Sequence, residues 1–339
     1  MLYSIQYMRA IAAFLVVIHH AAWKGVQFSN DPLYWFHVGS IGVDLFFIIS
    51  GFIMCYTVNK KKVLFLNFIK DRFVRIIPLY WLLTSLALIG YLVFPEKINS
   101  SGGETDILAS YTLFPSEGKY LINNGWTLSY EFLFYFIFST SLLMNLYIKF
   151  LLPCLIIFTF YIFGFIISSD NYFFLFLTSH YILEFSFGIL AFYIFQKNIK
   201  SFYWAVFFIL ISIVFVLYVN INIDNVKPNR IIQFGLPSFV FFIGMILMEP
   251  IFRTKSNFFL SRLLIALGDS SYSLYLSHIF TLVIFSVLFS YLGINENGIS
   301  FILLLVIFSL VIGHICYVCV EKPLLKITKS FMIKKKNDV

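Results

Sequence analysis

Long apolar runs, separated by short polar segments, recur along almost the whole chain. Many of them approach the length of about 20 residues that an α-helix needs to cross a bilayer. Stretches such as Phe301–Gly313 (FILLLVIFSLVIG) do not alternate apolar and polar residues, as the strands of a membrane barrel would. Because lipid offers the backbone no hydrogen-bond partners, the pattern predicts an all-α, polytopic transmembrane helical bundle.

Hydropathy predicts about ten spans. Their expected limits are 5–22, 36–58, 78–95, 126–142, 150–168, 172–195, 202–220, 231–250, 271–293 and 299–320. The segments between them contain no soluble domain or internal repeat. We therefore expect one transmembrane domain over residues 1–322, followed by a basic cytosolic tail, 323–339.

Basic residues orient the predicted spans. With the N-terminus inside, 18 of the 24 Lys and Arg residues fall on the cytosolic side and five on the opposite side. Membrane proteins carry such an excess in their cytosolic loops, so both termini are expected in the cytosol. The formal net charge of +8 then reflects orientation and calls for no nucleic-acid partner, although Lys334–Lys336 would suit anionic lipid heads.

Ionisable residues in the first two spans are candidate site residues, because charges at bilayer depth are costly. Arg9 and His20 are close to three helical turns apart and share one helix face. A snorkelling arginine and an interfacial histidine would explain them equally well. A hydrogen bond from His20 to the Asp44 carboxylate would satisfy both groups and make the histidine a better base, whereas Asp44 is equally suited to cap a helix.

Further candidates lie just before the third span and at the start of the fourth. Arg72 and Arg75 form one cationic pair on a helical turn, which suits phosphates, although the positive-inside rule also explains them. On the outer side, Trp126 fits either an aromatic belt or a substrate contact. Glu131 lies about a turn into the apolar run, near Tyr135 at i+4, and needs a partner.

A polar stripe marks the ninth span. Ser271, Tyr275 and His278 follow i, i+4, i+7, and their face forms either the wall of a site or a helix–helix hydrogen-bond seam. Glu321, at the cytosolic exit of the tenth span, is placed to pair with the arginines of the first loop. The Cys316/Cys319 pair is interpreted as helix packing, and no metal is expected.

By predicted depth these residues form two sets. The inner set contains Arg9, Arg72, Arg75, Ser271, Tyr275 and His278, and the outer set contains His20, Asp44, Trp126 and Glu131. A cytosolic donor site joined to an acceptor site nearer the outside would have this arrangement. A transporter pathway would have it too.

Six segments occur in series: IQYMRAIAAFLVVIHH, GVDLFFIISGF, RFVRIIPLYW, GWTLSYEFLFY, SYSLYLSH and VEKPLLK. Each is a weak signal alone, but their order and spacing together are specific. The chain resembles membrane acyltransferase family 3, which includes exopolysaccharide and O-antigen O-acetyltransferases, over nearly its whole length. Its opening resembles the exopolysaccharide-production branch most closely.

The resemblance implies a multi-pass protein of the bacterial cytoplasmic (inner) membrane. It would move an acetyl group from cytosolic acetyl-CoA to a hydroxyl of a cell-surface polysaccharide or its lipid-linked precursor. His20 would be the catalytic residue, as general base or transient acyl carrier, with Asp44 and Glu131 beside it. The donor would be bound by Arg9, Arg72, Arg75, Ser271, Tyr275 and His278, and the acceptor by Trp126.

The expected partners are the glycan or lipid-linked glycan acceptor and membrane lipids, with polysaccharide-assembly proteins as further candidates. Two alternatives remain open at this point. One is a lipid-linked glycan transporter or flippase without acyl-transfer chemistry, and the other is a non-catalytic assembly scaffold. Acetyl is favoured over other acyl groups only through the resemblance.

Overall fold

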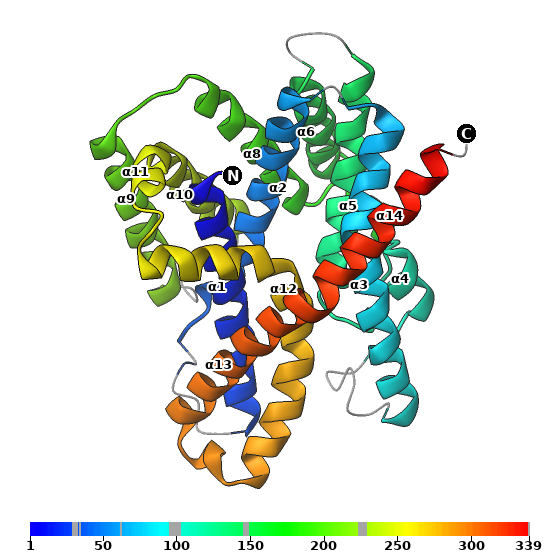
Figure 1. Cartoon of the computed structure of the whole chain (residues 1–339), viewed down its shortest axis with the longest axis vertical. Helices are drawn as coiled ribbons and strands as arrows, with labels where there is room; N and C mark the ends of the chain where they lie inside the picture. The colour runs from blue at the N-terminus through cyan, green and yellow to red at the C-terminus, as the bar shows by residue number, and fades with distance from the viewer. Residues whose placement is uncertain are drawn as a thin grey trace. The chain divides into compact units, whose positions relative to one another are not determined.

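The computed structural model describes residues 1–28, 33, 35–61, 63–94, 103–144, 149–222 and 229–337, and this part of the chain is helical (Figure 1). Within it, extended backbone pairs only at an isolated bridge between Thr105 and Lys119. The predicted all-α class is therefore confirmed. Among the described residues, seven helices have the length and composition to cross a membrane: Tyr3–Phe28, Val38–Lys60, Phe65–Val93, Tyr172–Gln196, Phe202–Ile221, Phe259–Tyr291 and Gly298–Ser330.

The described part of each predicted span lies mostly on helix, and three of these helical segments are shorter than the rest. They are α5 (Gly125–Thr140), α6 (Leu151–Ile166) and the segment Ile231–Leu247, which joins η3 (Ile231–Gly235) to α10 (Leu236–Leu247).

Two expected cytosolic loops are largely helical instead. Helix α3 (Phe65–Val93) begins well before residue 78, and α12 (Phe259–Tyr291) begins well before residue 271. Charged residues lower the hydropathy of these segments, but Lys and Arg are good helix formers, so the helices extend beyond the apolar runs.

The described chain divides into two compact units. Unit 1 comprises Met1–Ile53 and Phe187–Tyr317, and unit 2 comprises Met54–Ser186 and Val318–Val339. The boundaries lie inside α2 (Ile41–Lys60), α8 (Tyr181–Gln196) and η5 (Tyr317–Glu321).

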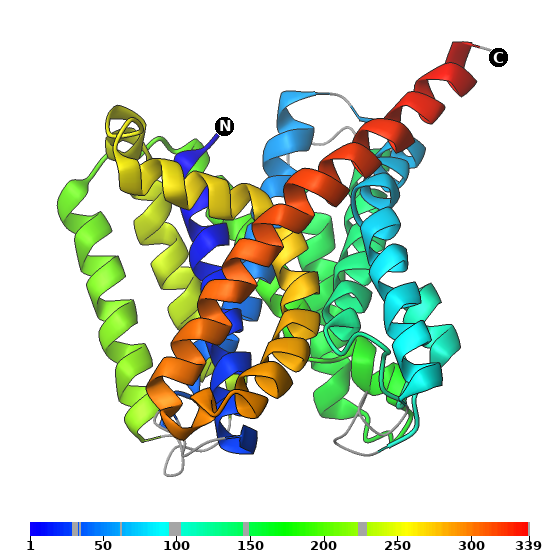
Figure 2. The ribbon, with the colours of Figure 1, turned by 60° about the horizontal axis from the view of Figure 1, so that its bottom comes forward.

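Unit 1 is built around α1 (Tyr3–Phe28), which packs along α12, while α12 also packs along α13 (Gly298–Cys316) (Figures 1 and 2). Near its start α1 contacts α12 through Gln6 and Asp269, and further along through His20 and His278. Because both contacts advance in the same sense, α1 and α12 run parallel. Gly268 of α12 makes the approach close, since a Cβ there would collide with the Gln6 carbonyl.

The other helices of unit 1 run between the region at one end of α1 and the region at its other end. Helix α9 (Phe202–Ile221) ends beside the start of α2, where Asn220 Oδ1 accepts from the backbone N–H of His37 at 3.0 Å. The segment that follows ends beside the start of α1. There Glu249, the first residue of α11 (Glu249–Thr254), accepts from the backbone N–H of Ser4 at 2.7 Å. The segment Ile231–Leu247 therefore runs from one end of the α1–α2 pair to the other.

Unit 2 is held together by aromatic packing between helices. Phe134 of α5 stacks on Phe185 of α8 with ring centroids 4.4 Å apart, and Phe138 stacks on Phe150 at 5.7 Å. The same unit contains α3, α4 (Ile107–Thr112), α6, α7 (Tyr172–Leu177) and α14 (Lys322–Asn337). The described side chains end at residue 330, so Lys334–Lys336 lie outside them.

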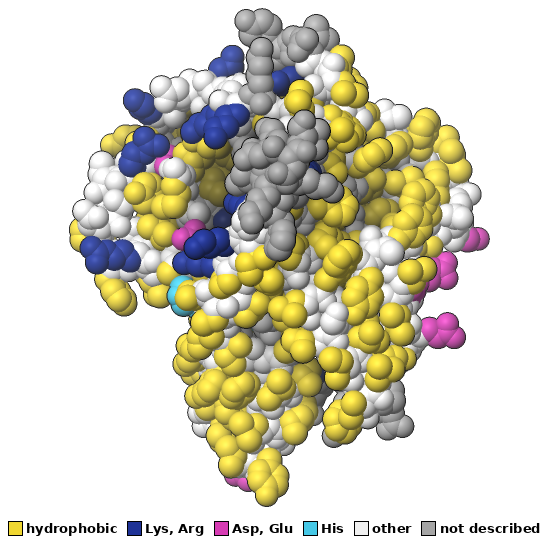
Figure 3. Space-filling model, turned by 45° about the vertical axis from the view of Figure 1, so that its right-hand side comes forward, with side chains coloured by type: hydrophobic (Ala, Val, Ile, Leu, Met, Phe, Trp, Pro, Cys, Tyr) yellow, Lys and Arg dark blue, Asp and Glu magenta, His cyan; other side chains and the backbone are white. Residues whose placement is uncertain are grey.

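The surface has the character expected for lipid contact. Hydrophobic side chains cover broad areas of the face in Figure 3, and the Lys and Arg side chains on this face gather toward its upper left. In unit 1, α9 exposes large apolar side chains such as Leu210 and Val214, which are 57% and 63% accessible. A soluble protein rarely exposes continuous apolar area of this kind, so these faces are suited to a bilayer.

Candidate functional site

A histidine pair lies at the contact between α1 and α12. Nδ1 of His20 is 3.0 Å from Nε2 of His278, and Nδ1 of His278 is 2.9 Å from the backbone carbonyl of Leu274. His278 is fully buried, whereas His20 remains partly accessible. The predicted division by depth is therefore wrong for His278, which lies level with His20. The reason is the early start of α12, which carries His278 five helical turns beyond Phe259.

The rest of the predicted stripe on α12 is also buried. The ring of Tyr275 lies 6.1 Å from that of His278 and 5.7 Å from Phe46 of α2. Ser271 is 1% exposed, and its hydroxyl has no hydrogen-bond partner among the described residues. The stripe thus faces the interior of unit 1, which fits both a site wall and a polar helix seam.

A second polar contact between α1 and α12 involves Arg9. Gln6 donates from Nε2 to Oδ1 of Asp269 at 3.0 Å, and its Oε1 accepts from Arg9 Nη1 at 3.4 Å. Sequence reasoning missed Gln6 and Asp269. Their signal was weak, because each lies near the end of its predicted span, where polar residues are common.

Asp44 is the clearest correction. Its Oδ2 accepts from Nη2 of Arg230 at 2.6 Å, and the Asp44 carboxylate is fully buried. His20 is hydrogen-bonded to His278 instead, so the predicted Asp44–His20 bond is wrong. A buried carboxylate is satisfied better by a guanidinium than by a neutral imidazole. The sequence did contain a signal, since Arg230 is one of few basic residues on the predicted outer side.

In unit 2, the predicted arginine pair lies on one turn of α3. Arg75 Nη1 donates to Oε1 of Glu321 at 2.6 Å, which confirms the expected pairing of Glu321 with this arginine region. Arg72 lies over the ring of Phe68, with 5.6 Å between the guanidinium carbon and the ring centroid.

The outer-side candidates of unit 2 lie on α5. The Tyr135 hydroxyl donates to Oε1 of Glu131, so the partner that this carboxylate needs is its neighbour at i+4. Trp126 packs on Tyr181 with ring centroids 4.9 Å apart and on Tyr130 at 6.0 Å. Aromatic faces of this kind suit the apolar faces of sugar rings as well as simple packing.

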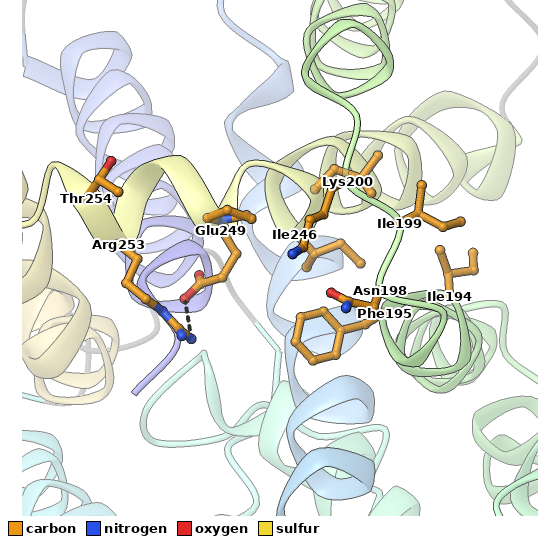
Figure 4. A pocket seen from close by; sticks show the side chains of 11 residues that line it. Ile194, Phe195, Asn198, Ile199, Lys200, Ile246, Glu249, Arg253 and Thr254 are labelled. Carbon is orange, nitrogen blue, oxygen red and sulfur yellow. Dashed lines mark ion pairs between the residues drawn. The ribbon is translucent and has the colours of Figure 1, made fainter.

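A separate pocket of about 400 Å³ lies at the end of unit 1 where α8 ends and α10 meets α11. Phe195 and Ile246 form an apolar part of its wall, and Lys200 and Arg253 add positive charge (Figure 4). Glu249 faces it too, with Arg253 Nη2 3.7 Å from Glu249 Oε1. None of the predicted site residues lines this pocket.

The described residues contain no group of three or more His, Cys, Asp and Glu side chains that would hold a metal ion. All four cysteines are free, and Cys319 is exposed.

Comparison with known proteins agrees with the resemblance seen in the motifs. A family model described as an acyltransferase domain matches residues 2–318. The exopolysaccharide production protein ExoZ of Rhizobium meliloti (strain 1021) is 29% identical over 307 residues, which cover 86% of this chain and 91% of that protein. No solved structure matches significantly. The chain belongs to acyltransferase family 3.

Proposed function

We propose that the chain is a membrane O-acyltransferase that moves an acetyl group from cytosolic acetyl-CoA to a sugar hydroxyl. The acceptor is a cell-surface polysaccharide or its lipid-linked precursor. Family membership over residues 2–318 and the likeness to an exopolysaccharide production protein support this class of reaction. The observation that carries the proposal is His20, a partly accessible imidazole whose Nδ1 is engaged by a buried partner.

We infer ten spans with both termini in the cytosol, in the bacterial inner membrane. The segment Ile231–Leu247 links opposite ends of the α1–α2 pair, which supports counting it as a span despite its length. With it counted, α12 runs in the same direction as α1, in agreement with their parallel contacts. In unit 2, α5 and α6 have 16 residues each, close to the minimum for a crossing.

In the proposed reaction, His20 removes the proton from the acceptor hydroxyl as that oxygen attacks the thioester carbonyl carbon. The carbon–sulfur bond then breaks, and the imidazolium returns the proton to the leaving CoA thiolate. A buried donor such as Tyr275 is suited to stabilise the oxyanion that develops on the carbonyl.

The donor's phosphates require cations. Arg72 and Arg75 are one helical turn apart, and their guanidinium groups suit phosphate oxygens. In unit 1, Arg9 lies in the early turns of α1, where its Nη1 donates to Gln6 Oε1. We assign these arginines to the donor, and Trp126 and Glu131 to the acceptor.

The test supplies radiolabelled acetyl-CoA to inside-out vesicles and follows label in polysaccharide and lipid-linked saccharide. We expect His20→Ala to lower the rate by about 10² to 10⁴-fold, the usual contribution of a general base. His19→Ala changes the preceding residue of α1. It is the matched control, and its acetylation rate should be unchanged. Arg72→Ala should raise the KM for acetyl-CoA.

The outcomes separate the candidate functions. Normal acetylation by a well-expressed His20→Ala protein would refute the assignment of His20. A flippase predicts glycan movement that survives this substitution and needs no CoA, and a scaffold predicts tolerance of Arg72→Ala as well. Failure of the purified protein to bind or turn over CoA esters would overturn the proposed function itself.

A further inference from the structure

His278 is fully buried, and both of its ring nitrogens are engaged. Its Nδ1 lies 2.9 Å from the Leu274 carbonyl oxygen, which can only accept, so Nδ1 carries a hydrogen. An imidazolium at such a buried position would need an anion beside it. Neither this ring nor that of His20 is hydrogen-bonded to a carboxylate among the described residues. His278 is therefore neutral, and its Nε2 is a hydrogen-bond acceptor.

An acceptor at Nε2 of His278 decides the tautomer of His20. Nδ1 of His20 lies 3.0 Å from that acceptor and must supply the hydrogen. A neutral imidazole has a single N–H, so Nε2 of His20 keeps its lone pair.

We propose that His278 is a positioning residue that holds His20 in the Nδ1–H tautomer and makes Nε2 of His20 the reacting atom. The catalytic relevance rests on the proposed function, whereas the tautomer itself does not. As Nε2 takes the proton from the acceptor hydroxyl, the charge that forms on His20 strengthens the Nδ1–H bond to His278. The Leu274 carbonyl fixes the orientation of the His278 ring, and His278 in turn fixes the orientation of the His20 ring.

This role resembles that of the carboxylate in a Ser–His–Asp triad, which selects the histidine tautomer without exchanging its proton. Here the orienting group is neutral and buried. It differs from the donor-binding role that the sequence predicted for His278. A simple helix seam would also need the His20–His278 bond, but it would place no requirement on which nitrogen of His20 carries hydrogen.

The direct test is ¹⁵N NMR of histidine-labelled protein in lipid nanodiscs, with His20 assigned by comparison with His20→Gln. We expect a pyrrole-type signal at Nδ1 and a pyridine-type signal at Nε2 of His20. His278→Leu should give a mixture of the two tautomers. His278→Gln, whose amide oxygen is an acceptor near the position of Nε2, should restore the Nδ1–H form.

The kinetic test uses the same variants and measures CoA release from acetyl-CoA. Because the imidazole of His20 remains, His278→Leu should lower kcat by about 10-fold or more, less than loss of the base itself. The KM for acetyl-CoA should stay within about twofold, and His278→Gln should recover most of kcat. His314→Leu, a histidine of α13 outside this network, is the matched control and should behave like the unaltered protein.

The NMR test and the kinetic test can be contradicted independently of each other. An Nε2–H tautomer of His20 in the unaltered protein would overturn the positioning role, whatever the activity. An equal loss of kcat in His278→Gln and His278→Leu, with a rise in KM, would show donor binding instead. If the NMR signals are as expected but no CoA ester is turned over, the proposed function fails while the tautomer assignment stands.

Discussion

The ion pair between Asp44 and Arg230 provides the sharpest test of how unit 1 is held together. Arg230 Nη2 and Asp44 Oδ2 are 2.6 Å apart, and the side chains are 20% and 0% exposed, respectively. Charge centres about 4 Å apart attract by about 4 kcal/mol at an effective dielectric constant of about 20. Burial of both charges offsets much of this attraction, so the net contribution of the pair is smaller than the cost of breaking it.

The unequal burial predicts unequal single substitutions. Arg230→Gln leaves a fully buried carboxylate without its guanidinium and should destabilise the fold by about 3–5 kcal/mol. Asp44→Asn keeps the shape of the side chain, and the arginine left behind is partly exposed and can reach water. Its cost should therefore be smaller, about 1–2 kcal/mol. The double variant, Asp44→Asn with Arg230→Gln, should be more stable than Arg230→Gln alone.

The assay is reversible unfolding in mixed micelles by titration with a denaturing detergent, followed by tryptophan fluorescence. Arg253→Gln is the matched control, because the Arg253–Glu249 pair is 3.7 Å long and Arg253 is 64% exposed. Such a surface pair contributes less than about 1 kcal/mol. The reasoning is refuted if Asp44→Asn costs as much as Arg230→Gln, or if the double variant shows the full sum of both losses.

Two further predictions concern helix starts. Glu249 accepts from the backbone N–H groups of Tyr3 and Ser4 at the positive end of α1, so Glu249→Ala should cost about 1–2 kcal/mol in the same unfolding assay, whereas Glu249→Gln should cost less. In the loop before α4, the hydrogen bond from the backbone N–H of Ala109 is the largest of several that lower the pKa of Asp106. The stability that the Asp106 carboxylate contributes is present above its unfolded-state pKa. It is lost as the pH falls through its lower folded-state pKa. Hydrogen exchange of α4 should therefore accelerate below about pH 4, and this acceleration should disappear in Asp106→Asn.

The helices were largely predictable because lipid imposes a length and an apolar composition on each span. The errors lie where charged residues continue a helix beyond the membrane. In α3 and α12 the charged residues lowered local hydropathy while keeping helix propensity high, so the pattern ended before the helix did. Because the start of α12 was predicted too late in the sequence, His278 was assigned the wrong depth.

The candidate residues were predictable one by one, but their partners were not. Glu131 and Tyr135 were placed side by side because both are on one helix and i, i+4 spacing fixes their distance, although the hydrogen bond between them was not predicted. His20 with His278 is separated by 258 positions in sequence, so no local periodicity relates them. Asp44 was paired with His20 because hydropathy places two groups at the same depth without saying which helices are neighbours.

The fold brings motifs that are distant in sequence into contact. Within unit 1 the histidine of the first motif meets the histidine of SYSLYLSH, and within unit 2 the second arginine of RFVRIIPLYW meets the glutamate of VEKPLLK. Each contact joins an early helix to a late one through groups that lipid would not tolerate alone. Small residues allow close packing of membrane helices, as Gly268 does against Gln6, and histidine side chains can link such helices by hydrogen bonds. Under the proposed acyl transfer, the imidazole of His20 acts on the acceptor hydroxyl as well as joining α1 to α12.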